Sequence, residues 1–149
     1  DFRSAPSPYA AMKLASEALA ASYRRCYGLP FAVARFSNVY GRYDSDLDRL
    51  ERAIWIFRRR ILDRQPVTVF GAEKTLDFTY VGDAVDATVR CADVADPADV
   101  YNIGGGEEAT MSRVITTLES LAGTRLQVDR SPQQRGDVRR TSADVTRAR

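Results

Sequence analysis

Short apolar runs alternate with helical patterns along this chain of 149 residues. The runs are rich in Val, Ile, Phe and Thr, and the segments between them place apolar residues at helical spacing. Strands that alternate with helices are typical of α/β folds built on a parallel sheet. Strands are predicted at residues 31–37, 67–70, 76–81, 100–103 and 125–128.

The predicted helices begin and end at clear signals. Residues 7–28 form the first, with Ser7 as N-cap, Pro8 in the first turn and Gly28 after the last turn. Because no strand precedes this helix, we expect the chain to be the second half of a larger α/β fold. Further helices are predicted at 46–64, from 82 or 83 to about 94, and at 111–122 before Gly123, with Leu50, Ile54, Phe57 and Ile61 as the apolar stripe of the 46–64 helix.

Composition limits the chemistry of the chain. There is no histidine, and Cys26 and Cys91 lack metal-ligand spacing, so we expect no metal site and no histidine-based acid–base catalysis. No apolar run is long enough to span a membrane and no signal-peptide pattern occurs, so a cytoplasmic protein without membrane contact is expected. The net charge is +2 and the arginines at 58–60 lie on an amphipathic helix, so nucleic acid is not an expected partner.

Tyr9 and Lys13 lie four residues apart on the first predicted helix and therefore share one face. A phenol is a weak base at neutral pH, and a nearby ammonium stabilises the phenolate that removes a proton from a carbinol. Lysine is rare here, because 20 of the 22 basic residues are arginine. Taken alone, the pair fits either a catalytic pair or two surface residues of an alanine-rich helix.

Six motifs in order identify a resemblance. SPYAAMK, ARFSNVYG, VTVFG, LDFTYVGD, YNIGGG and RGDVRRTSAD follow one another over nearly the whole chain. This series resembles the extended short-chain dehydrogenases/reductases, specifically the NAD-dependent epimerases/dehydratases of nucleotide sugars, with the UDP-glucose and UDP-glucuronate 4-epimerases most similar. The resemblance implies the second half of a Rossmann-like doubly wound parallel sheet with a small mixed α/β substrate-binding domain. Residues 1–45 and 76–104 would belong to the first unit, and 46–75 and 105–149 to the second.

The resemblance implies roles at the reaction centre. Tyr9 would be the general base or acid toward the sugar 4-hydroxyl, and Lys13 would hold the nicotinamide ribose and support the phenolate. Phe36 would lie near the nicotinamide. Asn38 would hydrogen-bond the phosphate or the sugar, which suits an amide because it can donate without adding charge. Taken alone, Asn38 is better explained as a strand-ending residue in a turn.

The resemblance also implies residues that bind the nucleotide. Thr68 and Phe70 would lie beside the uracil ring, although an edge strand with one buried aromatic fits the same sequence. Arg135 would form a fork onto the diphosphate, and Asp137 would lie near the ribose. Taken alone, the segment around Arg135 reads as a solvated polar tail.

The chain departs from the family at Leu76, where the family usually carries an arginine that pairs with the diphosphate. Lys74 is the candidate replacement, although a point charge holds phosphate less tightly than a guanidinium fork. The GGGEEA segment at 104–109 lacks the spacing of a dinucleotide fingerprint, so we interpret it as a flexible turn.

The expected function is therefore part of a nucleotide-sugar 4-epimerase, with NAD as the cofactor, a UDP-sugar as the substrate and a homodimer as the complete form. A nucleotide-sugar 4,6-dehydratase or a UDP-glucuronate decarboxylase is the alternative of the same family. A non-catalytic nucleotide-binding or interaction module is the alternative of another class. Because no dinucleotide fingerprint occurs in the sequence, we expect the 149 residues alone to be inactive and to expose apolar faces.

Overall fold

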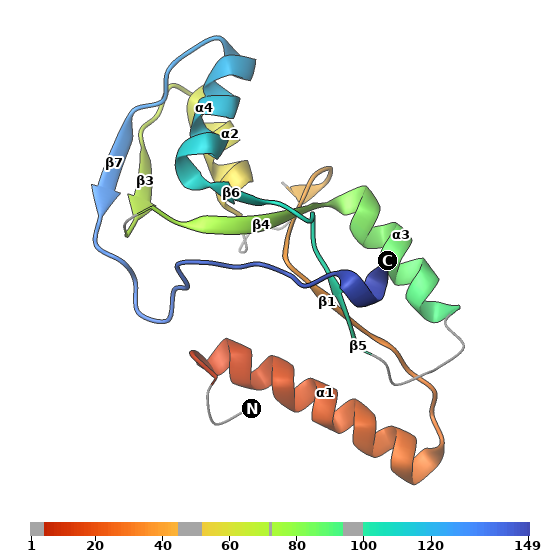
Figure 1. Ribbon diagram of the computed structural model, residues 1–149. Coiled ribbons are helices and arrows are strands. Elements are labelled where there is room, and N and C mark those ends of the chain that lie inside the picture. Colours follow the sequence, from red (N-terminus) through yellow and green to blue (C-terminus); the bar gives the residue numbers. More distant parts are fainter. Residues whose placement is uncertain (1–4, 45–51, 72, 94–99) are drawn as a thin grey trace.

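The computed structural model describes residues 5–44, 52–71, 73–93 and 100–149 (Figure 1). Helices and strands alternate through most of this part of the chain, as predicted. In chain order the elements are α1 (Pro8–Tyr27), β1 (Val33–Phe36), β2 (Asn38–Tyr40), α2 (Ala53–Leu62), β3 (Val67–Phe70), β4 (Thr75–Tyr80), α3 (Val81–Ala92), β5 (Val100–Ile103), β6 (Glu108–Thr110), α4 (Met111–Ala122), β7 (Val128–Ser131) and the short 3-10 helix η3 (Thr146–Ala148).

The strands form three small sheets that are mostly parallel. β1 pairs with β5, β2 pairs with β4, and β3 pairs with β7, each in parallel register. β6 adds to β4 in antiparallel register. Parallel pairs joined by helices define an α/β fold, so the predicted fold class is confirmed.

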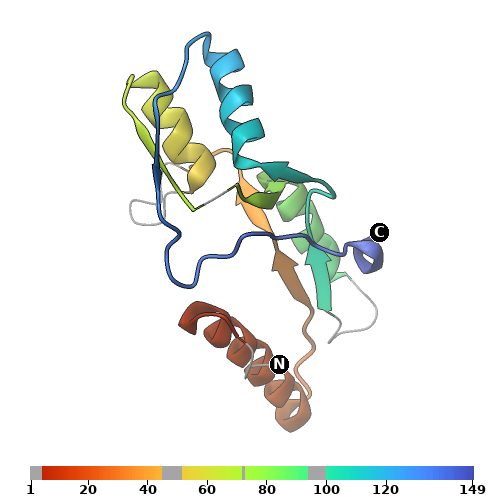
Figure 2. The ribbon, with the colours of Figure 1, turned by 60° about the vertical axis from the view of Figure 1, so that its left-hand side comes forward.

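The best-buried core lies between the helices α2 and α4 and the β3–β7 pair, at the top of Figures 1 and 2. Alternate residues of β3 point into it, as the pleat of a half-buried strand requires. Its buried members are Phe57, Ile61, Val67, Val69, Met111, Ile115 and Leu126. The β1–β5 pair lies apart from this cluster, with α3 packed against β1. The proposed division into two domains stays a prediction.

The first helix has the predicted signals at both ends. Ser7 Oγ accepts a hydrogen bond from the Ala10 N–H (3.2 Å), and Gly28 closes the helix in the left-handed conformation, with φ +67°. No residue of α1 is buried, however, and the helix lies at one side of the molecule (Figure 1). Met12, Leu19 and Tyr27 are all more than half exposed.

Several predicted boundaries are wrong. Arg52 is extended, so α2 begins at Ala53, whereas the predicted helical residues 46–51, with Leu50, lie outside the described part of the chain. Within the run 31–37 only Val33–Phe36 forms a strand, β1, and the separate strand β2 follows it. β1 is half exposed, because it pairs with a single described strand. The last strand is shifted to Val128–Ser131, because Leu126 turns into the core and donates its N–H to Glu119 (2.7 Å).

The glycine segment is also not the flexible turn that we predicted. Glu108–Thr110 forms strand β6, and Gly104 and Gly105 pack directly against β4. A Cβ added at Gly105 would lie 2.0 Å from the Phe78 carbonyl oxygen, a distance that no side chain permits. Glycine is thus required here for close packing. The described residues contain no helix long and apolar enough to cross a membrane.

Candidate functional site

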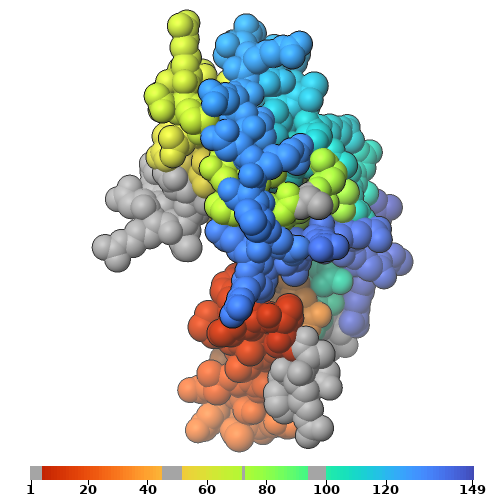
Figure 3. Space-filling model, turned by 90° about the vertical axis from the view of Figure 1, so that its left-hand side faces the viewer, coloured from red at the N-terminus to blue at the C-terminus, as the bar shows by residue number. Residues whose placement is uncertain are grey.

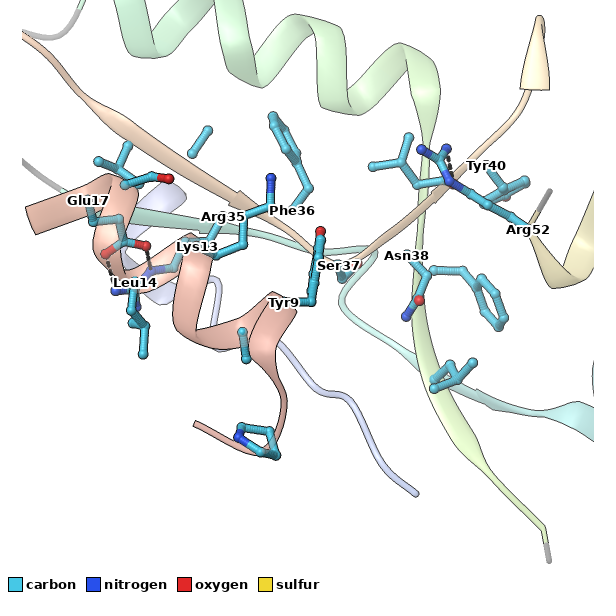
Figure 4. Close-up of a pocket in the computed structure, with 18 of the residues that line it drawn as sticks. Tyr9, Lys13, Leu14, Glu17, Arg35, Phe36, Ser37, Asn38, Tyr40 and Arg52 are labelled. Atoms are coloured by element: carbon cyan, nitrogen blue, oxygen red, sulfur yellow. Dashed lines mark hydrogen bonds and ion pairs between the residues drawn. The ribbon is translucent and has the colours of Figure 1, made fainter. Parts of the chain in front are cut away.

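Tyr9 and Lys13 project from the first turns of α1 toward the end of β1 (Figure 4). Lys13 Nζ lies 5.4 Å from the centroid of the Tyr9 ring, so the ammonium is close enough to stabilise a phenolate electrostatically. Both side chains are exposed, with Tyr9 at 65%. The Ser7 cap stabilises the start of α1, from which both side chains project.

A cleft of about 1040 Å³ lies between α1, the β1–β2 segment and the start of α2. Four of the predicted site residues line it: Tyr9, Lys13, Phe36 and Asn38 (Figure 4). Phe36 is 43% exposed at the carboxyl end of β1, the end at which open α/β sheets bind ligands. The structure therefore brings together the residues predicted for the reaction centre.

A bidentate ion pair joins α1 to β1 at one side of this cleft. Arg35 Nε and Nη2 donate to the two carboxylate oxygens of Glu17, at 2.8 and 2.6 Å. The hydrogen bonds from Arg35 lower the pKa of Glu17, and those to Glu17 raise the pKa of Arg35. Since this guanidinium is already paired with a carboxylate, it is less available to a bound anion.

Arg52 lines the cleft, and the sequence reasoning assigned it no role there. It donates to the Val39 carbonyl (2.9 Å) and forms an ion pair with Asp44 (3.3 Å), and its side chain is 45% exposed. A guanidinium has five N–H donors, and within the described residues both of these contacts engage Nη1. One signal in the sequence could have identified Arg52 as a site residue. It lies just before α2, on the polar side of an amphipathic pattern.

Leu76 also lines the cleft, so the departure from the family pattern lies at the site itself. Lys74 is not among the residues that line the cleft. Its ammonium instead forms an ion pair with Asp137, and the Lys74 side chain is only 12% exposed. Two residues that we assigned separately to diphosphate and ribose are thus partners of each other.

The remaining predicted nucleotide residues lie outside the lining of the cleft. Thr68 and Phe70 occupy the exposed face of β3, opposite the core. Arg135 is exposed on the C-terminal segment, which reaches the start of α1 (blue against red in Figure 3). A Cβ added to its neighbour Gly136 would lie 3.6 Å from Ser7 Cβ. The roles of all three residues stay predictions.

Asp77 is the centre of a buried network that the sequence reasoning missed. It is 2% exposed, and its carboxylate accepts hydrogen bonds from Gly105 N (2.7 Å), Ala143 N (3.0 Å) and Ser37 Oγ (3.2 Å). These contacts join the β1–β2 junction, the glycine segment and the C-terminal segment. The signal was an aspartate inside an apolar strand, which needs several donors if it is buried.

One of these contacts argues against the glycine segment as a phosphate loop. The Gly105 N–H is used by Asp77, and the segment presses against β4. A phosphate loop needs free backbone N–H groups. Among the described residues, no group of acidic, cysteine or histidine side chains could hold a metal ion.

Parallel strands with helices between them, and a Tyr–Lys pair at a strand's carboxyl end, define a Rossmann-like α/β protein. Residues 2–104 match the sequence profile of the NAD dependent epimerase/dehydratase family. Because this match covers more than half of the chain, the chain belongs to that family.

Similar proteins include the UDP-glucose 4-epimerase of Mycolicibacterium smegmatis, 34% identical over 96% of this chain and 46% of that protein. The UDP-glucose 4-epimerase of Thermus thermophilus, solved in complex with NAD, is 31% identical, with a TM-score of 0.86 over 96% of this chain and 47% of that one. DesIV of Streptomyces venezuelae, a dTDP-glucose 4,6-dehydratase solved with NAD, is 27% identical, with a TM-score of 0.86 over 96% of this chain and 44% of that one. The chain thus spans about half the length of the relatives it matches.

Proposed function

We propose that the complete protein, meaning the enzyme of relatives' length that contains this chain, is an NAD-dependent nucleotide-sugar 4-epimerase acting on a UDP-sugar. The observation that carries this proposal is the presence of Tyr9, Lys13, Phe36 and Asn38 in one cleft. A phenol beside an ammonium suits proton transfer with a sugar carbinol. Membership of the epimerase/dehydratase family supports the same chemistry.

The residues of the cleft fit one end of NAD. An ammonium at Lys13 suits the ribose hydroxyls, and the exposed ring of Phe36 suits a flat nicotinamide. The pyrophosphate needs backbone N–H groups, and the described glycine segment has committed the Gly105 N–H to Asp77. This chain would therefore bind the nicotinamide end, and the rest of the complete protein would bind the pyrophosphate. When bound, NAD supplies a reversible hydride acceptor.

The proposed proton transfer runs through Tyr9. Its phenolate oxygen takes the proton from the 4-hydroxyl as the C4 carbon is oxidised, and returns it after the sugar has presented its other face. Lys13 stabilises the phenolate through the short distance between the ammonium and the ring. Phe36 keeps water from one side of the reacting centre.

The nucleotide would extend from this centre toward the β3–β7 pair and the C-terminal segment. In this proposal Thr68 and Phe70 contact the base, and Arg135 contacts the diphosphate. Lys74 and Asp137 would support nucleotide binding indirectly, through the ion pair that they form with each other. The position of Arg52 in the cleft supports a second cationic contact where Leu76 offers none.

A 4,6-dehydratase is the second candidate, because DesIV has the same fold at a similar TM-score. UDP-glucuronate decarboxylation is a third outcome of the same initial oxidation. Product analysis of the complete protein with UDP-glucose, UDP-glucuronate and dTDP-glucose separates them. An inverted C4 supports the epimerase, and loss of water or of carbon dioxide supports the alternatives.

The test of Tyr9 is its replacement by phenylalanine in the complete protein. Tyr9→Phe removes only the hydroxyl, so turnover is expected to fall by roughly a hundredfold or more, the range typical of a lost general base. Tyr27→Phe, on the same helix and 77% exposed, is the matched control and should turn over normally. Near-normal epimerisation by Tyr9→Phe would exclude this tyrosine as the base.

The complete protein is further proposed to be a homodimer. Large apolar side chains stay exposed along α1, including Met12, Leu19 and Tyr23, and such a face favours association. Light scattering of the complete protein measures the state directly, and a monomeric mass would contradict the proposal.

A further inference from the structure

The loop at residues 132–138 carries Arg135, and both of its ends are tied to the rest of the protein by backbone hydrogen bonds. The loop begins directly after β7, which pairs with β3. Just after the loop, the Arg139 carbonyl accepts a hydrogen bond from the Thr75 N–H (3.1 Å) at the start of β4. The two ends are therefore fixed, and the course of the loop between them is set by its side chains.

Lys74 joins the middle of this loop to the best-buried core. Its ammonium forms the ion pair with Asp137, and the Lys74 side chain is only 12% exposed. Its backbone carbonyl accepts a hydrogen bond from the N–H of Met111 (3.0 Å), which is a buried member of that core. Because a partly buried charge pair is screened less than an exposed one, this contact is suited to hold the loop.

Asp137 in turn holds the turn that contains Arg135. Its backbone carbonyl accepts a hydrogen bond from Gln133 Nε2 (2.7 Å), so the two sides of the turn are joined. Between them, Gly136 adopts a left-handed conformation with φ +79°, which favours glycine. With Asp137 bound to Lys74, the turn has one direction relative to the core.

The tip of the loop lies against the start of α1, at the edge of the cleft (Figures 1 and 3). A Cβ added at Gly136 would lie 3.6 Å from Ser7 Cβ and 3.9 Å from the Pro6 carbonyl oxygen. Pro6 lines the cleft that also contains Tyr9. Arg135 is the exposed neighbour of Gly136, so the loop presents this guanidinium beside the edge of the cleft.

We propose that Lys74 is a positioning residue, whose ion pair with Asp137 holds the 132–138 loop so that Arg135 meets the nucleotide diphosphate. Lys74 is not among the residues that line the cleft, and its ammonium is engaged by Asp137. It therefore acts through the loop and does not contact the phosphate itself. This inference rests on the proposed function, which supplies the diphosphate. It deepens that function because it makes one ion pair decide how tightly the nucleotide binds.

Calorimetry of the complete protein with UDP tests the inference through a double-mutant cycle. Lys74→Met keeps the length of the side chain but removes its charge. The loop must then be ordered when the nucleotide binds, so the dissociation constant of UDP should rise about fivefold. Asp137→Asn should have the same effect, and the double variant should bind no more weakly than either single variant, because all three lack the same contact.

Arg135→Gln tests whether the anchor acts through the guanidinium. Loss of a charge-assisted hydrogen bond should weaken UDP binding about tenfold, and adding Lys74→Met to this variant should weaken it no further. Arg90→Met removes the exposed ion pair with Asp86 on α3. It is the matched control and should leave UDP binding unchanged.

Turnover and NAD binding separate positioning from a general loss of structure. Lys74→Met should raise KM for the UDP-sugar without lowering kcat, and should leave the affinity for NAD unchanged, whereas an unstable variant loses both ligands together. If Lys74→Met does not fold, Lys74→Gln takes its place in the cycle.

Three results would overturn the inference: unchanged UDP binding in the Lys74 variant, equal losses of UDP and NAD, or losses that add in the double variant with Asp137→Asn. Added losses would mean that Lys74 contacts the nucleotide directly. If the unaltered complete protein binds no UDP, the proposed function itself fails.

Discussion

Asp77 shows how one buried side chain can organise a site that it does not line. Its carboxylate accepts two backbone N–H groups and the Ser37 hydroxyl, and its own carbonyl holds the Asn38 amide. Hydrogen bonds to a charged group are stronger than neutral ones, by roughly a factor of two. Ser37 lies between Phe36 and Asn38 in the chain. The contacts of Asp77 therefore help to position the segment that carries these two cleft residues.

At the same point, Gly105 gives a prediction about stability. Gly105→Ala places a Cβ 2.0 Å from the Phe78 carbonyl oxygen, so β4 or the glycine segment must move and the contact with Asp77 must break. We expect a destabilisation of at least about 3 kcal/mol, measured by denaturant unfolding of the complete protein. Gly28→Ala is the control. It meets no atom within 4 Å and costs only its left-handed backbone, about 1 kcal/mol. Equal effects of the two variants would contradict the close packing.

At the scale of elements, α1 is the helix that carries the proposed base, and its contact with the rest of the molecule is slight. It has no buried residue, and the bidentate pair between Glu17 and Arg35 is a link that fixes it to β1. Both partners are partly exposed, so this link is modest in strength and sensitive to salt. The placement of Tyr9 against the end of β1 depends on such contacts.

The link between α1 and β1 predicts a pH dependence. Arg35 lowers the pKa of Glu17 from its ordinary 4.5, so the folded state holds this proton less tightly than the unfolded state. The stabilisation is complete above pH 4.5 and is lost as the pH falls through the lowered pKa. Hydrogen exchange in α1 should therefore speed up in acid relative to α4. Glu17→Gln should show fast exchange in α1 already at neutral pH. The control is Asp86→Asn, which removes the exposed Asp86–Arg90 ion pair on α3 and should leave exchange in α1 unchanged. If Glu17→Gln leaves exchange in α1 unchanged, the ion pair between Glu17 and Arg35 does not stabilise α1 on β1.

At the scale of the whole molecule, the chain has one well-packed core and one open region. The core joins α2, α4 and the β3–β7 pair, whereas α1 and β1 line the cleft with large side chains exposed. Apolar surface of this extent is costly in water. The family match and the coverage of about half of each relative agree with a chain that contributes part of a larger site.

This division of the site predicts how the 149 residues bind ligands alone. In the proposed function the described part binds the nicotinamide end of NAD, whereas the Gly105 N–H of its glycine segment is already used by Asp77. Calorimetry of the isolated chain should show no measurable NAD binding and at most weak UDP binding. The complete protein is the positive control. Tight NAD binding by the isolated chain would mean that the pyrophosphate site lies within it.

Local signals determined much of the fold in advance. Ser7, Pro8 and Gly28 set the ends of α1, and Gly123 ends α4, because caps and left-handed residues act within one turn of the chain. Tyr9 and Lys13 share a face for the same local reason. The class of the fold followed from the order of strands and helices.

Tertiary contacts decided what the local signals could not. The shift of β7 depends on Leu126 entering the core, and the close packing of the glycine segment depends on β4 and Asp77, which lie far away in sequence. The pairing of Lys74 with Asp137, and the turning of the Asn38 amide toward Thr141, are likewise contacts across the chain. The sequence by itself determined which residues are available for chemistry and which helix carries them. Only the tertiary structure decided which of their donors and charges are left free, because a hydrogen bond is committed only when distant segments meet.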